Sequence, residues 1–313
     1  MYLSRAVLAG RSAVHASPML THGFVVARGA VAPATCALVR SHALAESQSP
    51  WHWPTLRHAY QRLAGGGLRE QRHRVHLPLP LSAPVDALVR AALSPSTGLV
   101  DAMRCVGLSA DAALVELSVM LALPGATAQR AHTDVPPDHT QPMATLWCAL
   151  QDTPEEMGAT RVCPASPAAV ATAADWARQR SLSAAAAARQ FEPAAAGEGL
   201  LGGFSWAHAA AAPCDAPFTP EELGVGAATA LELATGDSFV MDCRVFHFGG
   251  GNGTQRVRAQ LSATFQEPAS RDEGERRTDG GSDGFTYELH RSLRGHGVRL
   301  GRFVDVERGR DFV

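Results

Sequence analysis

Short runs of alternating apolar and polar residues in the middle and second half of the chain restrict the fold most strongly. In the run LVELSVMLALPG, which begins at Leu114, one face of an expected strand carries Leu117, Val119, Leu121 and Leu123, and the other carries Glu116, Ser118 and Met120. Further strand-like runs follow at residues 143–151, 159–163, 229–233, 237–247 and 257–265. They do not alternate with helices in a βαβ rhythm. The pattern predicts an α+β protein with a mainly β core, folded as a double-stranded β-helix (jelly-roll) barrel.

Helices are expected around this core. Residues 22–46 read as a short strand, a turn at Ala32 and Pro33, and a helix. Residues 82–93 have helical spacing, with Pro84 near the start and Pro95 just past the end. Residues 50–80 show no clean period and are expected to form loops and short helices. An alanine-rich stretch at about 167–224 predicts a helical insertion, residues 267–284 a mobile loop, and residues 287–293 a last helix.

These segments predict one domain over residues 21–313. It comprises a helical N-terminal part (21–113), a jelly-roll core (114–266) with the insertion, and a loop with a terminal helix (267–313). Residues 1–20 contain arginines and serines, and no acidic residue precedes Glu46. A targeting (transit) peptide and a disordered basic terminus explain this composition equally well.

Composition restricts the partners and the compartment. The 28 basic and 30 acidic residues nearly balance, so the overall field does not attract nucleic acid or anionic membranes. No apolar run approaches the roughly 20 residues that span a bilayer. The six cysteines form no C-x-x-C pair, which favours reduced thiols in an intracellular compartment, either the cytoplasm or a mitochondrial or plastid matrix. A small-molecule substrate is therefore expected, and the oligomeric state stays open.

One set of residues has the chemistry of a metal site. His132 and Asp134 flank Thr133, and on a strand both side chains would point to the same face. The run at 237–247 ends at His247, and Arg258 follows on the next strand. Two imidazoles and a carboxylate on one face of iron leave three positions for a bidentate 2-oxo acid and dioxygen. The far carboxylate of that acid would need a fixed cation, for which arginine suits better than lysine.

Other residues leave alternatives open. Arg256 competes with Arg258, because strand parity points both side chains to the same side. Trp147 lies in an apolar strand, so core packing and a pocket-lining role are both open. Asn252 is expected to support the glycine-rich turn after His247, and His139 is expected at the rim rather than as a further ligand.

Four segments carry a family resemblance: GFVVARGAVAP, PGATAQRAHTD, LWCALQDTPEEMGATRVCPAS, and HFGGGN with an arginine eleven residues after the histidine. Through them, residues 21–266 resemble the phytanoyl-CoA dioxygenase family of Fe(II)/2-oxoglutarate-dependent oxygenases. The resemblance implies that His132, Asp134 and His247 are the catalytic iron ligands. It also implies that Arg258 anchors 2-oxoglutarate and that Trp147 lines the co-substrate pocket.

The implied activity is hydroxylation of a C–H bond in a small organic or lipid-like substrate, with release of succinate and CO2. Fe(II) would be the cofactor, with 2-oxoglutarate and O2 as co-substrates, and ascorbate is left open as a further cofactor. Because Asp134 is present, halogenation is disfavoured. Pro164-Ala165-Ser166-Pro167 and Gly249 depart from the family's pattern, which leaves the co-substrate contacts and the substrate undetermined.

Two other functions are compatible with the three metal ligands. One is a catalytically silent metal-binding jelly-roll protein with a sensing or scaffolding role, against which the complete ligand set and Arg258 argue. The other is a cupin-like or zinc hydrolase site, which would not need Arg258.

Overall fold

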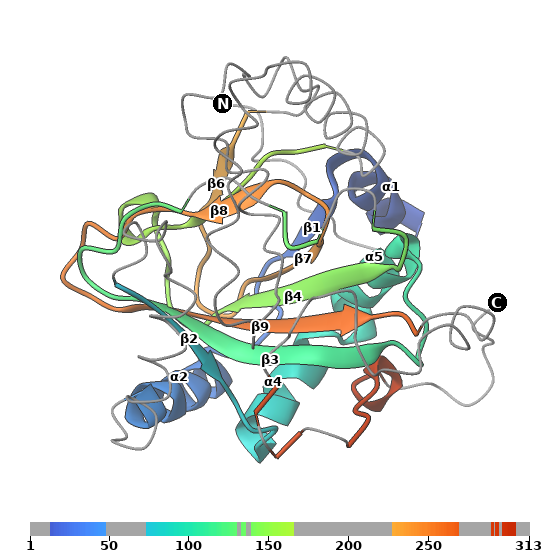
Figure 1. Ribbon diagram of the computed structural model, residues 1–313, viewed down its shortest axis with the longest axis horizontal. Coiled ribbons are helices and arrows are strands. Elements are labelled where there is room, and N and C mark those ends of the chain that lie inside the picture. The colour runs from blue at the N-terminus through green and yellow to red at the C-terminus, as the bar shows by residue number, and fades with distance from the viewer. Residues whose placement is uncertain are drawn as a thin grey trace, which may run out of the picture.

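Antiparallel strands predominate in the computed structural model, with a few helices beside them (Figure 1). The structure describes residues 13–47, 73–129, 133–135, 139–165, 227–268, 289–290, 292–293 and 296–304. No helix within these ranges is long and apolar enough to cross a membrane.

The described strands form two sheets. The larger sheet has the strand order β1-β7-β4-β9-β3-β2. Its strands, in that order, are Phe24–Ala27, Ser238–Asp242, Met143–Ala149, Arg258–Gln266, Ala113–Ala122 and Arg74–Pro78. The smaller sheet has the order β6-β5-β8, formed by Thr229–Leu231, Thr160–Val162 and His247–Gly249. All pairings between these strands are antiparallel.

One face of the larger sheet packs against helices. Because side chains alternate along a strand, Leu117 and Val119 of β3 lie on the same face as Leu261 and Phe265 of β9, and all are fully buried. They share one hydrophobic cluster with α2 (Pro33–Ser47), α4 (Ala83–Ala92) and α5 (Leu99–Val106). Burying each such side chain contributes about 1.5–3 kcal/mol. This layer fixes the register of β3 and β9.

The opposite face of the larger sheet is turned toward the smaller sheet. Phe239 and Met241 of β7 pack there against Val162 and Leu231 of the smaller sheet. Thr160 of β5 also donates a hydrogen bond to the Gln260 side chain of β9, at 3.0 Å. Every second residue of β9 from Arg258 onward therefore faces the smaller sheet. This arrangement places the candidate site between the two sheets.

Most of the predicted strands are confirmed, as is the helix at 82–93, where α4 follows Ser82 and has proline in its first turn. The expected strand and helix over residues 22–46 correspond to β1 and α2. The run at 237–247 is two strands, because a turn at residues 243–246 carries the chain from β7 in the larger sheet to β8 in the smaller one.

The prediction of loops and short helices at residues 50–80 is wrong for residues 74–78, which form β2 and pair with β3. The alternation of this strand is hidden because its site-facing residues are the basic Arg74 and His76. The helix α5 was not expected, although its apolar spacing is helical and Gly107 ends it with a positive φ of 100°.

Part of the N-terminal segment 1–20, which was expected to be a targeting peptide or a disordered terminus, belongs to a helix. Residues 13–22 form α1 (Ala13–His22), which lies against α5, and Met19 is only 2% exposed. Residues 1–12, the predicted insertion at 167–224 and the predicted loop from 269 to 284 lie outside the described residues. Of the expected last helix, residues 289–290 and 292–293 are described, and they form irregular chain and a turn.

Within the described ranges the two sheets share no strand pairing, so these strands alone form no closed barrel. The five cysteines in this part of the chain form no disulfide with one another, and Cys214 lies outside it.

Candidate metal and dicarboxylate site

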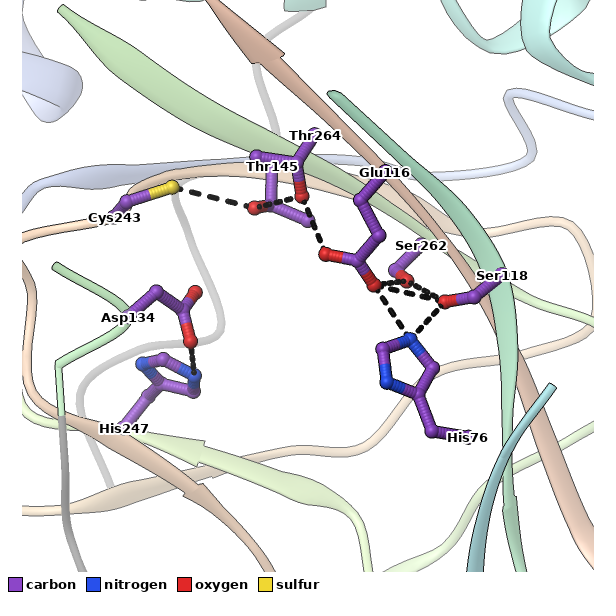
Figure 2. A network of polar contacts seen from close by, with 9 residues as sticks. All are labelled: His76, Glu116, Ser118, Asp134, Thr145, Cys243, His247, Ser262 and Thr264. Carbon is purple, nitrogen blue, oxygen red and sulfur yellow. Dashed lines mark hydrogen bonds and ion pairs between the residues drawn. The ribbon is translucent and has the colours of Figure 1, made fainter. Parts of the chain in front are cut away.

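The side chains of Asp134 and His247 lie together between the sheets (Figure 2). His247 is the first residue of β8 and is 4% exposed. The backbone N–H of Asp134 donates to the carbonyl of Cys243 at 2.9 Å, which ties the loop after β3 to the end of β7. As a result, Nε2 of His247 lies 3.5 Å from Oδ1 of Asp134.

The orientation of His247 favours metal binding. Its Nδ1 lies 3.0 Å from the carbonyl oxygen of Val245, which can only accept a hydrogen bond, so Nδ1 carries the proton. In the neutral ring, Nε2 then presents its lone pair toward the Asp134 carboxylate. Two ligand atoms at right angles, each about 2.1 Å from one metal ion, lie about 3 Å apart. The pair therefore fits two neighbouring ligands of a divalent metal.

His132 lies outside the described residues, so the structure does not place the third predicted ligand. Within the described part of the chain no group of three or more His, Cys, Asp or Glu side chains could hold a metal ion. The expectation that the His-x-Asp segment is a strand is wrong for Asp134, which lies in a bend. The strand ends earlier because β3 stops at Ala122 and is followed by Pro124 and Gly125.

Two side chains that the sequence did not single out fix the turn after His247. Arg74 of β2 donates to the carbonyl of Thr127 at 2.9 Å, to that of Gly249 at 3.1 Å and to that of Gly250. The backbone N–H of Gln129 donates to the carbonyl of Gly249 at 2.9 Å, and the side-chain oxygen of Gln129 accepts from the N–H of Gly249, also at 2.9 Å. These contacts join the segment before His132 to the segment after His247.

Arg258 supplies a buried positive charge. It is 2% exposed, its Nη1 donates to the carbonyl of Gly158, and its Nε has no hydrogen-bond partner among the described residues. No acidic side chain in the described part of the chain pairs with it. Burial, together with the nearby charge of Arg74, lowers the pKa of Arg258 to about 9. A buried cation without a counter-charge is costly, so this position suits the carboxylate of a ligand.

The structure separates the two candidate arginines. Arg256 is exposed in the turn before β9, where its backbone N–H donates a hydrogen bond to the Thr254 hydroxyl oxygen at 3.2 Å. Asn252 supports this turn as predicted, because its side chain donates to the carbonyls of Ala122 and Arg256 and accepts from Thr254. Of the two, only Arg258 lies on the buried face toward the smaller sheet.

Trp147 packs as a core residue, and its proposed role in lining a pocket stays a prediction. Its ring stacks on Phe239, with centroids 6.1 Å apart and planes at 14°, as a core residue would. Its indole Nε1 is buried and has no hydrogen-bond partner among the described residues. An unpaired buried donor is unfavourable, so Trp147 also offers a hydrogen bond to a ligand.

Comparisons with known proteins give a family and similar folds for the chain. The model of the phytanoyl-CoA dioxygenase family matches residues 19–260. Among solved structures, the non-heme alpha ketoglutarate dependent carbocyclase SnoK from nogalamycin biosynthesis has a TM-score of 0.53 and 15% identity, over 87% of this chain and 93% of its own. The epimerase SnoN, in complex with Fe3+, alpha ketoglutarate and nogalamycin RO, has a TM-score of 0.48 and 16% identity, over 88% and 93%.

The structure of AviO1 from Streptomyces viridochromogenes Tue57 has a TM-score of 0.47 and 15% identity, over 84% of this chain and 98% of its own. No curated protein matches the chain. At 15% identity the likeness to SnoK describes the fold alone. The family model, in contrast, covers most of the sequence, including Asp134, His247 and Arg258. The chain therefore belongs to the phytanoyl-CoA dioxygenase family.

Proposed function

We propose that the protein is an Fe(II)- and 2-oxoglutarate-dependent dioxygenase. In this proposal His132, Asp134 and His247 hold the iron, and Arg258 binds the far carboxylate of 2-oxoglutarate. The observation that carries the proposal is the combination of two converging side chains, Nε2 of His247 and Oδ1 of Asp134, with a buried arginine that has no acidic partner among the described residues. Fe(II) and 2-oxoglutarate are the cofactor and co-substrate of the family to which the chain belongs.

The two sheets are proposed to form the double-stranded β-helix of such enzymes, and residues 21–313 one domain with a helical insertion at about 167–224. The likeness of the fold to SnoK, at a TM-score of 0.53, supports this arrangement. The packing of the two sheets against each other around Phe239 and Met241 also supports it.

When bound, iron and 2-oxoglutarate supply an oxidant derived from O2, with release of succinate and CO2. The chain's own residues orient and shield this chemistry. The Val245 carbonyl holds the His247 ring in position, and Arg258 fixes one end of the co-substrate. The Trp147 N–H offers it a hydrogen bond, and the apolar cluster around Phe239 excludes water from one side.

Hydroxylation of a small organic or lipid-like substrate is the proposed outcome. SnoK is described as a carbocyclase, so this fold also serves other outcomes, and product analysis has to decide between them.

The proposal is tested by release of labelled CO2 and succinate from 2-oxoglutarate in the presence of Fe(II), first without substrate and then with a compound library. Asp134→Ala, His247→Ala and His132→Ala are expected to abolish release while circular dichroism stays unchanged. Asp111→Ala and His73→Ala, which change exposed residues of the same types, serve as controls and should retain it. Release at the wild-type level by a ligand variant would remove that residue from the iron site.

A further inference from the structure

A half-buried carboxylate that the proposed chemistry does not use, that of Glu116, lies on the same face of the larger sheet as Arg258. Glu116 of β3 is paired in register with Thr264 of β9, and Thr264 is paired with Thr145 of β4. On the opposite face of the same strands, Leu117 and Ala263 belong to the hydrophobic core. Glu116 therefore faces the smaller sheet and lies on the same side of the larger sheet as the candidate iron ligands.

The Glu116 carboxylate is the acceptor at the centre of a polar network (Figure 2). Its Oε1 lies 2.7 Å from Nε2 of His76 and accepts hydrogen bonds from Ser118 at 2.8 Å and Ser262 at 2.9 Å. Its Oε2 accepts from Thr264 at 3.0 Å. A carboxylate oxygen accepts about two hydrogen bonds, and Thr264 is the one donor to Oε2 in the described part of the chain. Oε2 therefore retains acceptor capacity.

This network leads directly to the Asp134 backbone. The Thr264 hydroxyl lies 2.9 Å from that of Thr145, which lies 3.4 Å from the thiol of Cys243. The carbonyl of Cys243 in turn accepts the N–H of Asp134. Figure 2 shows the Glu116 network beside the Asp134–His247 pair. Arg258 and Thr264 stand six residues apart on β9, about 20 Å, so the positive charge and the Glu116 network occupy opposite ends of the strand.

The charge of Glu116 is maintained although the side chain is only 14% exposed. Burial raises the pKa of Glu116, but the charge of His76 and the hydrogen bonds from His76, Ser118 and Ser262 outweigh it and hold the pKa at about 2. Glu116 is therefore an ionised acceptor that has, among the described residues, His76 as its ion-pair partner and one hydrogen bond on Oε2.

We propose that Glu116 is a substrate-binding residue that receives a protonated amine of the substrate, at the end of the site opposite Arg258. This inference rests on the proposed oxygenase function and narrows its substrate class. A carboxylate with acceptor capacity beside Asp134 favours a basic nitrogen and disfavours the anionic groups of fatty acids and acyl-CoA thioesters. His76, Ser118 and Ser262 position the carboxylate.

The test compares three probes of equal chain length, hexan-1-amine, hexan-1-ol and hexanoate, by calorimetry on the anaerobic protein loaded with Fe(II) and 2-oxoglutarate. The wild-type protein is expected to bind the amine roughly 10- to 100-fold more tightly than the alcohol, as for one charge-assisted contact. Glu116→Gln should remove that preference. Glu156→Gln changes an exposed glutamate and should preserve it.

The inference is overturned if the wild-type protein binds the three probes equally or does not bind the amine. It is also overturned if the Glu116→Gln variant keeps the preference for the amine, because Glu116 would then only join β2, β3 and β9. If Glu116→Gln does not fold, Glu116→Asp, which keeps the charge but withdraws it by one methylene, should lower amine affinity. Binding of 2-oxoglutarate is measured on the same samples. Its absence contradicts the proposed function, whereas its presence without amine preference contradicts only this inference.

Discussion

Arg258→Gln is expected to weaken the binding of 2-oxoglutarate strongly while leaving the fold and the iron affinity nearly unchanged. Arg258 is 2% exposed, and its Nε has no partner in the part of the chain that the structure describes, so a ligand carboxylate would form charge-assisted hydrogen bonds in a largely dry environment. Loss of such a contact costs about 2 to 5 kcal/mol, or roughly 30- to 5000-fold in Kd. Stability should fall little, because the substitution also removes a buried charge that lies near Arg74.

The assay is an anaerobic titration of 2-oxoglutarate into the Fe(II)-loaded protein, with Arg256→Gln as the matched control. Arg256 is exposed, so its replacement should change Kd less than about threefold. Arg258→Lys, which keeps the charge but not the planar fork, should give an intermediate loss. If Arg256→Gln is the impaired variant, the assignment is displaced by two residues. If neither variant matters, the co-substrate assignment fails.

Three further predictions follow from the buried groups. Arg74→Met should lower the free energy of unfolding by about 3 kcal/mol in urea titrations, because the carbonyls of Gly249, Gly250 and Thr127 lose their donor; unchanged stability would mean that other groups satisfy these carbonyls. The fold lowers the pKa of Glu116 from its ordinary value of 4.5 to about 2. Ionised Glu116 therefore contributes about 3 kcal/mol to the free energy of unfolding above pH 4.5, and this contribution is lost as the pH falls toward 2. In the Glu116→Gln variant the free energy of unfolding should depend less on pH in this range. An equally steep pH dependence in the variant would mean that other groups cause the loss of stability. Deletion of residues 1–20 should lower Tm, since the buried Met19 is worth about 2 kcal/mol or more; an unchanged Tm would show that α1 is dispensable.

The most accurate parts of the fold prediction came from strand alternation and from proline at a helix start. The faces of β3 were predictable because Leu117, Val119 and Leu121 repeat with a period of two, and the core confirms them. The helix α4 was predictable because proline stands at its start and its apolar spacing is regular. The strand β2 was not, because the alternating residues at 74 and 76 are basic and resemble a solvated loop.

The candidate site was predictable as a set of residue types and less so as a set of contacts. Histidine, aspartate and arginine at family spacing pointed to His247, Asp134 and Arg258, whose roles remain proposals. Spacing could not reveal that Arg74 binds the carbonyl of Gly249, because 175 residues separate them and only the pairing of β2 with β3 brings them together. It placed Glu116 on the polar face of β3 but could not show that the smaller sheet lies opposite that face.

The absorption spectrum of the anaerobic protein with Fe(II) and 2-oxoglutarate tests the central claim most directly. A weak visible charge-transfer band is expected when both are added and not with either alone. The band should be absent in His247→Ala and Asp134→Ala and should require far more 2-oxoglutarate in Arg258→Gln. A folded wild-type protein that shows no such band at saturating Fe(II) and 2-oxoglutarate would contradict the assignment of this site to a 2-oxoglutarate-dependent oxygenase.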